Sequence, residues 1–175
     1  MAARNLPMPS SPPPRTRAEF LACRRRYPLK LRCVESFNRL VCRVWYRLRR
    51  QGDCTVPASG PAIITANHTC SADPMMIYAG CGYRRISFMI AREFADLPVG
   101  RWFVRLIDCI PVRRDGRDAT ATKQAIRRLR DGHVMAIFIQ GRIPRPDEVA
   151  APKDGVALLA LRTGAPVIPV HLSGN

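Results

Sequence analysis

The sequence predicts a single α/β domain in which a mixed, mostly parallel sheet is flanked by helices. Short apolar runs recur along the chain, and segments with helical spacing separate them. Polar residues follow directly after several of these runs. Strands that alternate with helices are typical of parallel sheets. A chain of 175 residues is long enough to bury one core of this kind.

The chain divides into three parts. Residues 1–15 are rich in proline, serine and alanine, and we expect a disordered tail because this composition cannot bury an apolar face. Residues 16–52 are expected to form basic amphipathic helices, the first of which ends ahead of Pro28. Residues 53–175 are expected to form the α/β domain.

The segment from Leu31 to Arg50 has apolar residues at steps of three and four, which predicts one helical stripe. Arginines occupy many of the remaining positions. Two interpretations stay open: the stripe covers the sheet, or the helix lies on a membrane surface. The stripe taken alone favours the sheet, and the arginine density weakens that interpretation, since each basic group near an anionic leaflet can contribute about 1 kcal/mol. The stripe consists of Val34, Phe37, Leu40, Val41, Val44, Trp45 and Leu48.

The α/β domain is predicted from apolar runs bounded by turn residues. The first run, Pro61–Ala66, is β-branched at its centre and follows Gly60. We expect Asp118 to cap a helix that runs through Arg130, and Gly164 to close the last helix. The other predicted strands are Ile86–Ala91, Cys109–Val112, His133–Ile139 and Val167–Leu172, and the other predicted helices start at Pro74 or cover Pro98–Ile107 and Asp154–Arg162.

Polar residues at the ends of these strands are candidates for a binding site. In open α/β sheets, ligands bind outside the carboxyl ends of the strands. The predicted strands deliver His68, Arg92, Arg114 and Gln140 to that edge.

The net charge of +16 implies an anionic partner. Nucleic acid, a phospholipid surface and a phosphorylated substrate all qualify on charge alone. The seven cysteines never stand at C-x-x-C spacing, so we expect neither a zinc site nor a disulfide framework. The sequence offers no secretory signal and no run of about 20 apolar residues that would span a membrane.

His68 and Asp73 stand in one turn between the first strand and the helix that follows it. A carboxylate bonded to one ring nitrogen would fix the tautomer of the imidazole and leave the other nitrogen to accept a proton from a nucleophile. Alternatively, Asp73 only caps the helix and His68 only fills a loop. The turn taken alone favours this second interpretation, and the order of the segments downstream favours the first.

Four blocks in the chain match the pattern of a known family. His68-Thr69-Cys70-Ser71-Ala72-Asp73 has the form H-x-x-x-x-D, and Ile110–Arg114 is a hydrophobic block that ends in arginine. Phe138–Ile143 stands where the family usually has F-P-E-G-T-R, and Ile168–Val170 is a strand of the V-P-V type. In this order and spacing, over about residues 60–172, the chain resembles the glycerolipid acyltransferases of the 1-acylglycerol-3-phosphate acyltransferase type.

The resemblance implies a catalytic mechanism. His68 would take the proton from a hydroxyl of a lysophospholipid acceptor, and Asp73 would orient His68. The hydroxyl would attack the thioester of acyl-CoA or acyl carrier protein, with no bound cofactor and no metal. Arg92, Arg114 and Arg142 would bind the acceptor phosphate, whereas Arg113 is read as a solvated charge. Gln140 and Gly141 would position the acceptor.

The resemblance also implies a setting for the protein. We expect it at the cytoplasmic face of a membrane as a peripheral protein that takes part in phospholipid biosynthesis. Its partners would be the phospholipid surface, the lysophospholipid acceptor and, where it serves as donor, acyl carrier protein. No nucleic acid partner is expected, because the sequence has no recognisable nucleic-acid motif.

Two departures from the family pattern qualify these expectations. Gln140 replaces the usual glutamate and Ile143 the usual arginine, which predicts a changed acceptor preference; Arg142 or Arg145 could supply the missing cation. Relatives usually continue past the fourth block, so the chain is consistent with a C-terminally truncated fragment. A missing strand or helix would leave a sheet edge uncovered.

Two alternatives to the acyltransferase remain open. The first is a non-catalytic protein that binds acidic lipid or nucleic acid, and the second is a truncated inactive relative.

Overall fold

The computed structural model of the protein describes residues 17–25, 27–52, 55–81, 83–113, 118–145, 147–148 and 151–174. The predicted tail over residues 1–15 lies outside the described residues. The elements are, in chain order, α1 (Arg17–Arg25), α2 (Leu29–Val44), β1 (Ala62–Ala66), α3 (Asp73–Cys81), β2 (Ile86–Ala91), α4 (Arg92–Ala95), α5 (Pro98–Ile107), β3 (Ile110–Val112), α6 (Ala119–Arg130), β4 (Val134–Phe138), α7 (Gly155–Thr163) and β5 (Val167–Val170).

The five strands form one sheet in the order β3-β2-β4-β1-β5. Every pairing among these strands is parallel, so the α/β fold is confirmed, and the antiparallel component allowed by a mixed sheet is not found among the described strands. β1 lies between β4 and β5, with Ala66 opposite Phe138 on one side and Val170 on the other. The carboxyl ends of these three strands therefore lie side by side.

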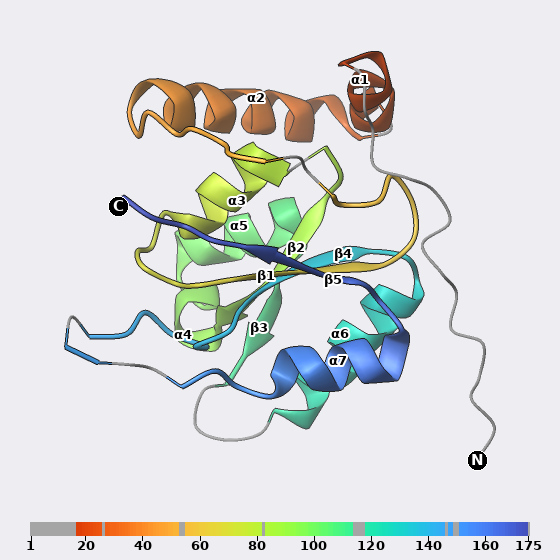
Figure 1. The fold of residues 1–175 in the computed structure, drawn as a ribbon, viewed down its shortest axis with the longest axis vertical. Helices are drawn as coiled ribbons and strands as arrows, with labels where there is room; N and C mark the ends of the chain where they lie inside the picture. Colours follow the sequence, from red (N-terminus) through yellow and green to blue (C-terminus); the bar gives the residue numbers. More distant parts are fainter. Residues whose placement is uncertain are drawn as a thin grey trace.

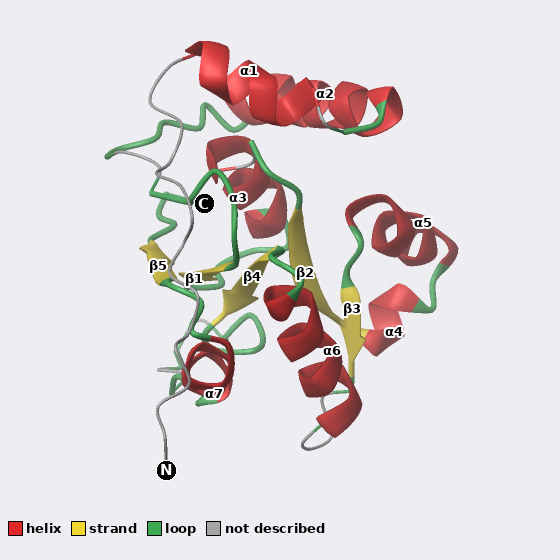
Figure 2. Ribbon diagram, turned by 90° about the vertical axis from the view of Figure 1, so that its right-hand side faces the viewer, coloured by secondary structure: helices red, strands yellow, loops and turns green. Residues whose placement is uncertain are grey.

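Helices cover both faces of the sheet (Figure 1, Figure 2). α3 packs on one face with α2 outside it, and α6 and α7 lie on the other face. The alternation of side chains along β1 explains the two cores, because Ala62, Ile64 and Ala66 belong to the core under α3. Ile63, which points to the opposite face, belongs to the core under α6 and α7.

α2 differs from the predicted helix in length and in orientation. It ends at Val44 rather than at Arg50, because Arg47 has a φ of 49° and the chain turns back there. The backbone N–H of Leu48 then donates to the carbonyl of Cys42 at 2.9 Å, and the Leu48 side chain packs against the core.

The predicted apolar stripe of α2 does not cover the sheet as a whole. α2 packs inward through Leu31, Glu35 and Cys42, which are buried. The outer face of α2, by which we mean Phe37, Leu40, Val44 and Trp45, is 58% to 83% exposed.

The other helices follow the sequence closely, with one addition. The Asp118 carboxylate accepts from the backbone N–H of Ala121 at 2.9 Å, and Gly164 ends α7 in the left-handed conformation, as predicted. α4 is a four-residue helix that the sequence did not indicate, and it places Arg92 on a helix rather than in a loop.

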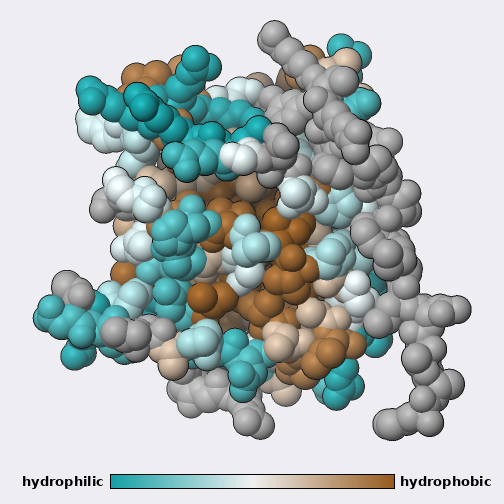
Figure 3. Space-filling view, viewed as in Figure 1, coloured by the Kyte–Doolittle hydropathy of each residue, from teal (hydrophilic) through white to brown (hydrophobic). Residues whose placement is uncertain are grey.

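The edge of the sheet at β5 pairs with no further strand among the described residues. Figure 3 shows a broad apolar area in the middle of the face on which Figure 1 places β5. A hydrophilic band lies above this area, where α2 crosses the view.

Candidate active site

The topology places a switch point of the sheet between the carboxyl ends of β1 and β4. The chain leaves β1 through α3 on one face of the sheet, and it leaves β4 through α7 on the other face. Neighbouring parallel strands whose connections leave toward opposite faces are the usual binding place in open α/β sheets. His68 follows β1 and Gln140 follows β4, so these two predicted residues meet there.

His68 and Asp73 form the pair that their spacing predicted. The Nδ1 atom of His68 lies 2.9 Å from Oδ2 of Asp73. The Asp73 side chain is fully buried, whereas 16% of the His68 side chain remains exposed. The carboxylate is therefore hidden behind the imidazole, and the imidazole can be reached from solvent.

The backbone of the turn holds the Asp73 carboxylate in place. Oδ2 accepts from the backbone N–H groups of Thr69 at 2.5 Å and Cys70 at 2.9 Å. The Thr69 hydroxyl donates to Oδ1 at 3.1 Å. Burial by itself would raise the pKa of Asp73, but the hydrogen bonds from His68, Cys70 and Thr69 outweigh it and lower the pKa.

An ionised Asp73 determines the tautomer of His68. A carboxylate can only accept, so the proton of the neutral imidazole lies on Nδ1, and Nε2 carries the free lone pair. The same carboxylate stabilises the imidazolium after Nε2 has taken up a proton. Asp73 is also the first residue of α3, but its carboxylate accepts from residues that precede the helix, so no capping bond to α3 is seen in the described part of the chain.

Two residues of the third block fix His68 from the side of β4. The ring of Phe138 stacks on the imidazole, with ring centroids 3.9 Å apart and planes inclined by 11°. The backbone N–H of His68 donates to Oε1 of Gln140 at 2.9 Å. The His68 ring thus contacts the last residue of β4, and the His68 backbone contacts the segment that follows β4.

Asn67 ties the turn to the segment after β5. Its side-chain amide donates to the carbonyl of Leu172 at 2.8 Å and accepts from the backbone N–H of Leu172 at 2.8 Å. The two bonds continue the pairing of β1 with β5 by one step through a side chain. The segments that adjoin the first and fourth blocks of the sequence are therefore joined directly.

The loop after Gln140 holds two of the other predicted residues. Gly141 has a φ of +70°, and the Lys153 side chain lies where a Cβ at this position would point. Arg142 forms an ion pair with Glu148, and the hydrogen bond from Arg142 lowers the pKa of Glu148. Arg142 and Glu148, with Arg145 and Asp147, line an open cavity of about 580 Å³.

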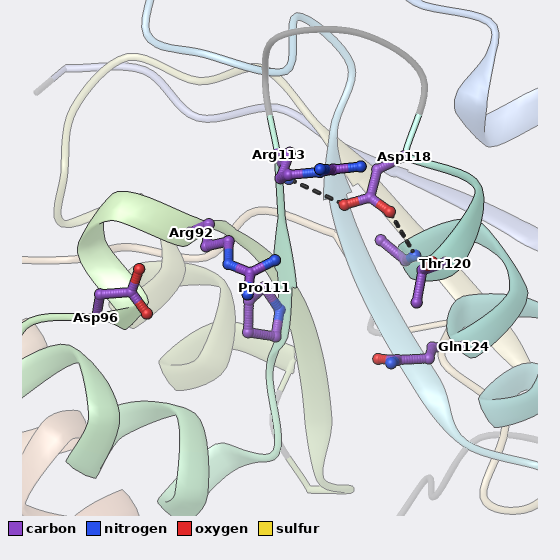
Figure 4. Close-up of a pocket in the computed structure, with 8 residues that line it drawn as sticks. Arg92, Asp96, Pro111, Arg113, Asp118, Thr120 and Gln124 are labelled. Carbon is purple, nitrogen blue, oxygen red and sulfur yellow. Dashed lines mark hydrogen bonds between the residues drawn. The ribbon is translucent and has the colours of Figure 1, made fainter.

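Arg92 lies in a second pocket, of about 490 Å³, at the carboxyl ends of β2 and β3. Figure 4 shows Arg92 reaching from α4 toward Pro111 on β3, with Arg113 and Asp118 above it. The lining of this pocket does not include His68 or Gln140. The pocket is completed by Asp96, Thr120, Ala121 and Gln124.

The two arginines of the second block have different positions relative to this pocket. Arg114, predicted to bind phosphate, lies outside the described residues. Arg113, predicted to be a solvated charge, lines the pocket together with Arg92. Its backbone N–H donates to Asp118 at 3.1 Å, and the N–H groups of Ala121 and Arg113 hold the pKa of Asp118 below its usual range.

Sequence reasoning missed Phe138, Lys153 and the position of Arg113 in the pocket. Phe138 is the last apolar residue of β4, and nothing in its own segment distinguishes it from a core residue. The pairing of the strands does provide a signal. Phe138 lies opposite Ala66, and the side chains of both residues belong to the core on the same face of the sheet. The sequence gives no such signal for Lys153, because it stands 12 positions after Gly141 and the residues between them do not determine the path of the loop.

Two other kinds of feature are absent from the described part of the chain. It contains no group of three or more His, Cys, Asp or Glu side chains that could hold a metal ion. Among the helices whose placement is described, none combines the length and apolar character that crossing a membrane requires.

Known proteins resemble this chain in sequence. The model of the Acyltransferase family matches residues 47–173. Over 120 residues the chain is 27% identical to the 1-acyl-sn-glycerol-3-phosphate acyltransferase of Bacillus subtilis, which covers 68% of this chain and 59% of that protein. Over 79 residues it is 35% identical to the lyso-ornithine lipid O-acyltransferase of Rhodobacter capsulatus, which covers 45% of this chain and 28% of that protein.

A solved structure resembles it in fold. The 1-acyl-sn-glycerophosphate (LPA) acyltransferase PlsC from Thermotoga maritima aligns with a TM-score of 0.61 at 24% identity, covering 79% of this chain and 55% of that one. At this identity the likeness shows the fold. The chain spans between 28% and 59% of the length of the curated relatives that it matches.

Proposed function

Because this chain belongs to the Acyltransferase family, we propose that it transfers a fatty acyl group from a thioester to a hydroxyl of a lysophosphatidic-acid-like glycerolipid. The donor is acyl-CoA or acyl-acyl carrier protein, and the product belongs to phospholipid biosynthesis. The observation that carries the proposal is the 2.9 Å bond between His68 and the buried carboxylate of Asp73.

The chemistry needs one base and no covalent enzyme intermediate. Nε2 of His68 takes the proton of the acceptor hydroxyl, whose oxygen attacks the thioester carbonyl carbon. The new C–O bond forms as the C–S bond breaks, and the imidazolium returns its proton to the leaving thiolate. Asp73 stabilises the imidazolium throughout. A base positioned in this way typically increases the reaction rate about 10² to 10⁴-fold.

Basic residues would hold the phosphate of the acceptor. Arg92 is proposed for this role, and Arg113, which shares its pocket, joins it. Arg114 remains a prediction for the same role. Arg142 could take part only by giving up Glu148 for the substrate, because the two form an ion pair. Gln140 and Gly141 are proposed to position the acceptor next to His68.

We propose that the outer face of α2 lies on an anionic phospholipid surface. A large exposed apolar face normally marks a site that another apolar surface covers. A helix that lies flat on a bilayer can bury such a face in the interfacial region. The exposed Arg47 and Arg49, which follow directly after this helix, match the negative charge of the lipid head groups. This location would bring the active site to the membrane in which its substrate resides.

The activity is tested by thiol release from acyl-CoA and acyl carrier protein on anionic liposomes, with lysophosphatidate or another lysolipid as acceptor. We expect release that depends on the acceptor and falls at least about 100-fold in His68→Ala. His171→Ala is the matched control, because the His171 side chain is exposed and His171 takes no part in the described hydrogen bonds of His68 and Asp73. Wild-type release by His68→Ala would exclude the mechanism. Absence of release by the folded, lipid-bound wild type would favour a non-catalytic lipid-binding protein.

The membrane location is tested by sedimentation with phosphatidylglycerol-containing vesicles. We expect Phe37→Ser combined with Trp45→Ser to reduce the bound fraction several-fold at unchanged thermal stability, since both side chains are more than 60% exposed. Leu161→Ser on α7, at a residue that is 80% exposed, is the matched control and should bind as the wild type does. Equal losses in both proteins would reject a specific role for α2.

A further inference from the structure

Lys153 extends over the turn at Gln140 and Gly141. A Cβ placed on Gly141 would lie 3.0 Å from Nζ of Lys153 and 3.1 Å from its Cδ and Cε atoms. The backbone of Lys153 is fixed to the same segment, because its N–H donates to the carbonyl of Ile139 at 2.9 Å. The ammonium group therefore lies next to the residue whose side chain holds His68.

The bare Gly141 is what allows this approach. The φ of +70° already favours glycine, and any side chain at this position would occupy the space of the Lys153 stem. Position 141 thus favours glycine for two reasons: the positive φ of the backbone and the close approach of the Lys153 side chain. Both serve to keep the ammonium close to the turn.

Gln140 contributes a second donor on this turn. The backbone N–H of His68 can only donate, so the amide oxygen of Gln140 must face it, and the bond is 2.9 Å long. The remaining polar group of the side chain is the Nε2 amide, which can only donate. A glutamate in this place would offer a second oxygen and a negative charge instead.

The first arginine of the loop is engaged by a carboxylate. Arg142 is paired with Glu148, and the second oxygen of Glu148 accepts from the backbone N–H of Arg145 at 3.3 Å. No ion pair of Lys153 is found within the described ranges of the chain. Lys153 is thus a cation whose charge is available to a substrate and whose side chain lies against the turn at Gly141.

We propose that Lys153 and the Gln140 amide form a donor-only subsite beside His68 that binds a phosphate oxyanion of the substrate. An oxyanion fits because both protein groups can only donate, whereas an ammonium or a hydroxyl hydrogen would find no acceptor there. Lys153 thereby supplies the cation that Ile143 does not provide. The assignment rests on the proposed function. The phosphate belongs either to the acyl-CoA donor or to the acceptor lipid, and in the second case Lys153 takes the role proposed above for Arg92 and Arg113.

The scarcity of lysine allows a test that needs no turnover. The chain has lysine only at Lys30, Lys123 and Lys153, so acetylation by an amine-reactive ester can be followed at each by mass spectrometry. We expect lysophosphatidate in neutral detergent micelles to slow acetylation of Lys153 at least threefold. Lys123, exposed on α6, should react equally with and without the lipid. Monoacylglycerol, which lacks the phosphate, should protect neither residue.

Kinetics then identify the source of the phosphate. In Lys153→Met we expect a KM at least tenfold higher for the phosphate-bearing substrate, with kcat reduced much less, and partial recovery in Lys153→Arg. A higher KM for lysophosphatidate places the acceptor at this subsite, and a higher KM for acyl-CoA alone places the donor there. Lys123→Met is the control and should match the wild type in both constants.

The outcomes separate the two proposals. Protection of Lys153 without any acyl transfer would support the subsite and reject the proposed reaction. Acyl transfer with equal acetylation of Lys153 and Lys123, and with unchanged KM values in Lys153→Met, would reject the subsite and leave the reaction in place.

Discussion

The imidazole of His68 lies flat on the ring of Phe138, with the ring centroids 3.9 Å apart. The two residues come from neighbouring strands, since Phe138 ends β4 and His68 follows β1. The bond to Asp73 sets the direction in which Nδ1 points, and the stacked ring sets the plane of the imidazole. Together they leave Nε2 a single orientation, which is what a positioned base requires.

Replacing Phe138 by leucine tests this relationship. Leucine keeps most of the apolar volume but offers no flat surface, so the imidazole can tilt about its bond to Asp73. We expect kcat to fall about tenfold while the KM of both substrates stays close to that of the wild type. Steady-state kinetics at saturating donor and acceptor would measure this. Ile137→Leu, on the opposite face of β4, is the control; an equal kcat in Phe138→Leu and wild type would show that the stacking has no positioning role.

Asp73→Asn should impair both catalysis and stability. The carboxylate accepts from His68, from two backbone N–H groups and from a hydroxyl, and an amide would turn an NH₂ group toward some of these donors. We expect kcat to fall about 10² to 10⁴-fold. Leaving buried donors unsatisfied should also cost about 1–3 kcal/mol in the free energy of unfolding.

The lowered pKa of Asp73 gives that variant a distinct pH dependence. A carboxyl group with a folded pKa below its unfolded value of about 3.9 stabilises the fold above that pH, and the contribution is lost as pH falls through the folded pKa. The stability difference between wild type and Asp73→Asn should therefore shrink below about pH 4. Urea unfolding at pH 7 and pH 3.5 would measure it. An equal difference in unfolding free energy at the two pH values would mean that folding does not lower the pKa of Asp73.

The strands and most helix ends could be predicted because their signals are local. β1 and β2 lie within one residue of the predicted bounds, and Asp118 and Gly164 act as the cap and stop that their residue types favour. α4 could not be predicted, because four residues give no period. The early end of α2 depends on the packing of Leu48 against the core, which is a tertiary effect.

The candidate site was predictable only where residues stand close in sequence or belong to a recurring block. His68 and Asp73 lie five positions apart, and their spacing alone permits the contact. The bond from His68 to Gln140 spans 72 positions and needed the strand order as well. The stacking on Phe138 and the path of Lys153 follow from pairing geometry and loop conformation, which composition does not encode.

His133 should make the fold sensitive to mild acid. It lies before β4, where burial and the charge of Arg128 lower its pKa. The unfolded chain then takes up a proton at a higher pH than the folded one, so stability should fall as pH drops below about 6.5 and level off below the folded pKa. His133→Gln should reduce this slope. Unfolding free energies at pH 7.5 and pH 5.5 in both proteins would measure it, and parallel slopes would assign the sensitivity to another group.

Arg84 fixes the amino-terminal side of the sheet through three backbone carbonyls. Its guanidinium donates to the carbonyls of Pro57 at 3.0 Å, Gly60 at 2.7 Å and Gly132 at 2.6 Å, which joins the segments that lead into β1 and β4. Lysine keeps the charge but cannot reach all three acceptors with the same fork geometry.

We therefore expect Arg84→Lys to lower the free energy of unfolding by about 2–4 kcal/mol, because one or two charge-assisted hydrogen bonds are lost. Chemical denaturation would measure the change. Arg130→Lys is the matched control, since Arg130 is exposed and makes one long bond, at 3.4 Å, to the carbonyl of Arg162. Its cost should stay below about 0.5 kcal/mol. Similar costs in the two variants would mean that the three-carbonyl contact adds nothing beyond the charge of an ordinary surface arginine.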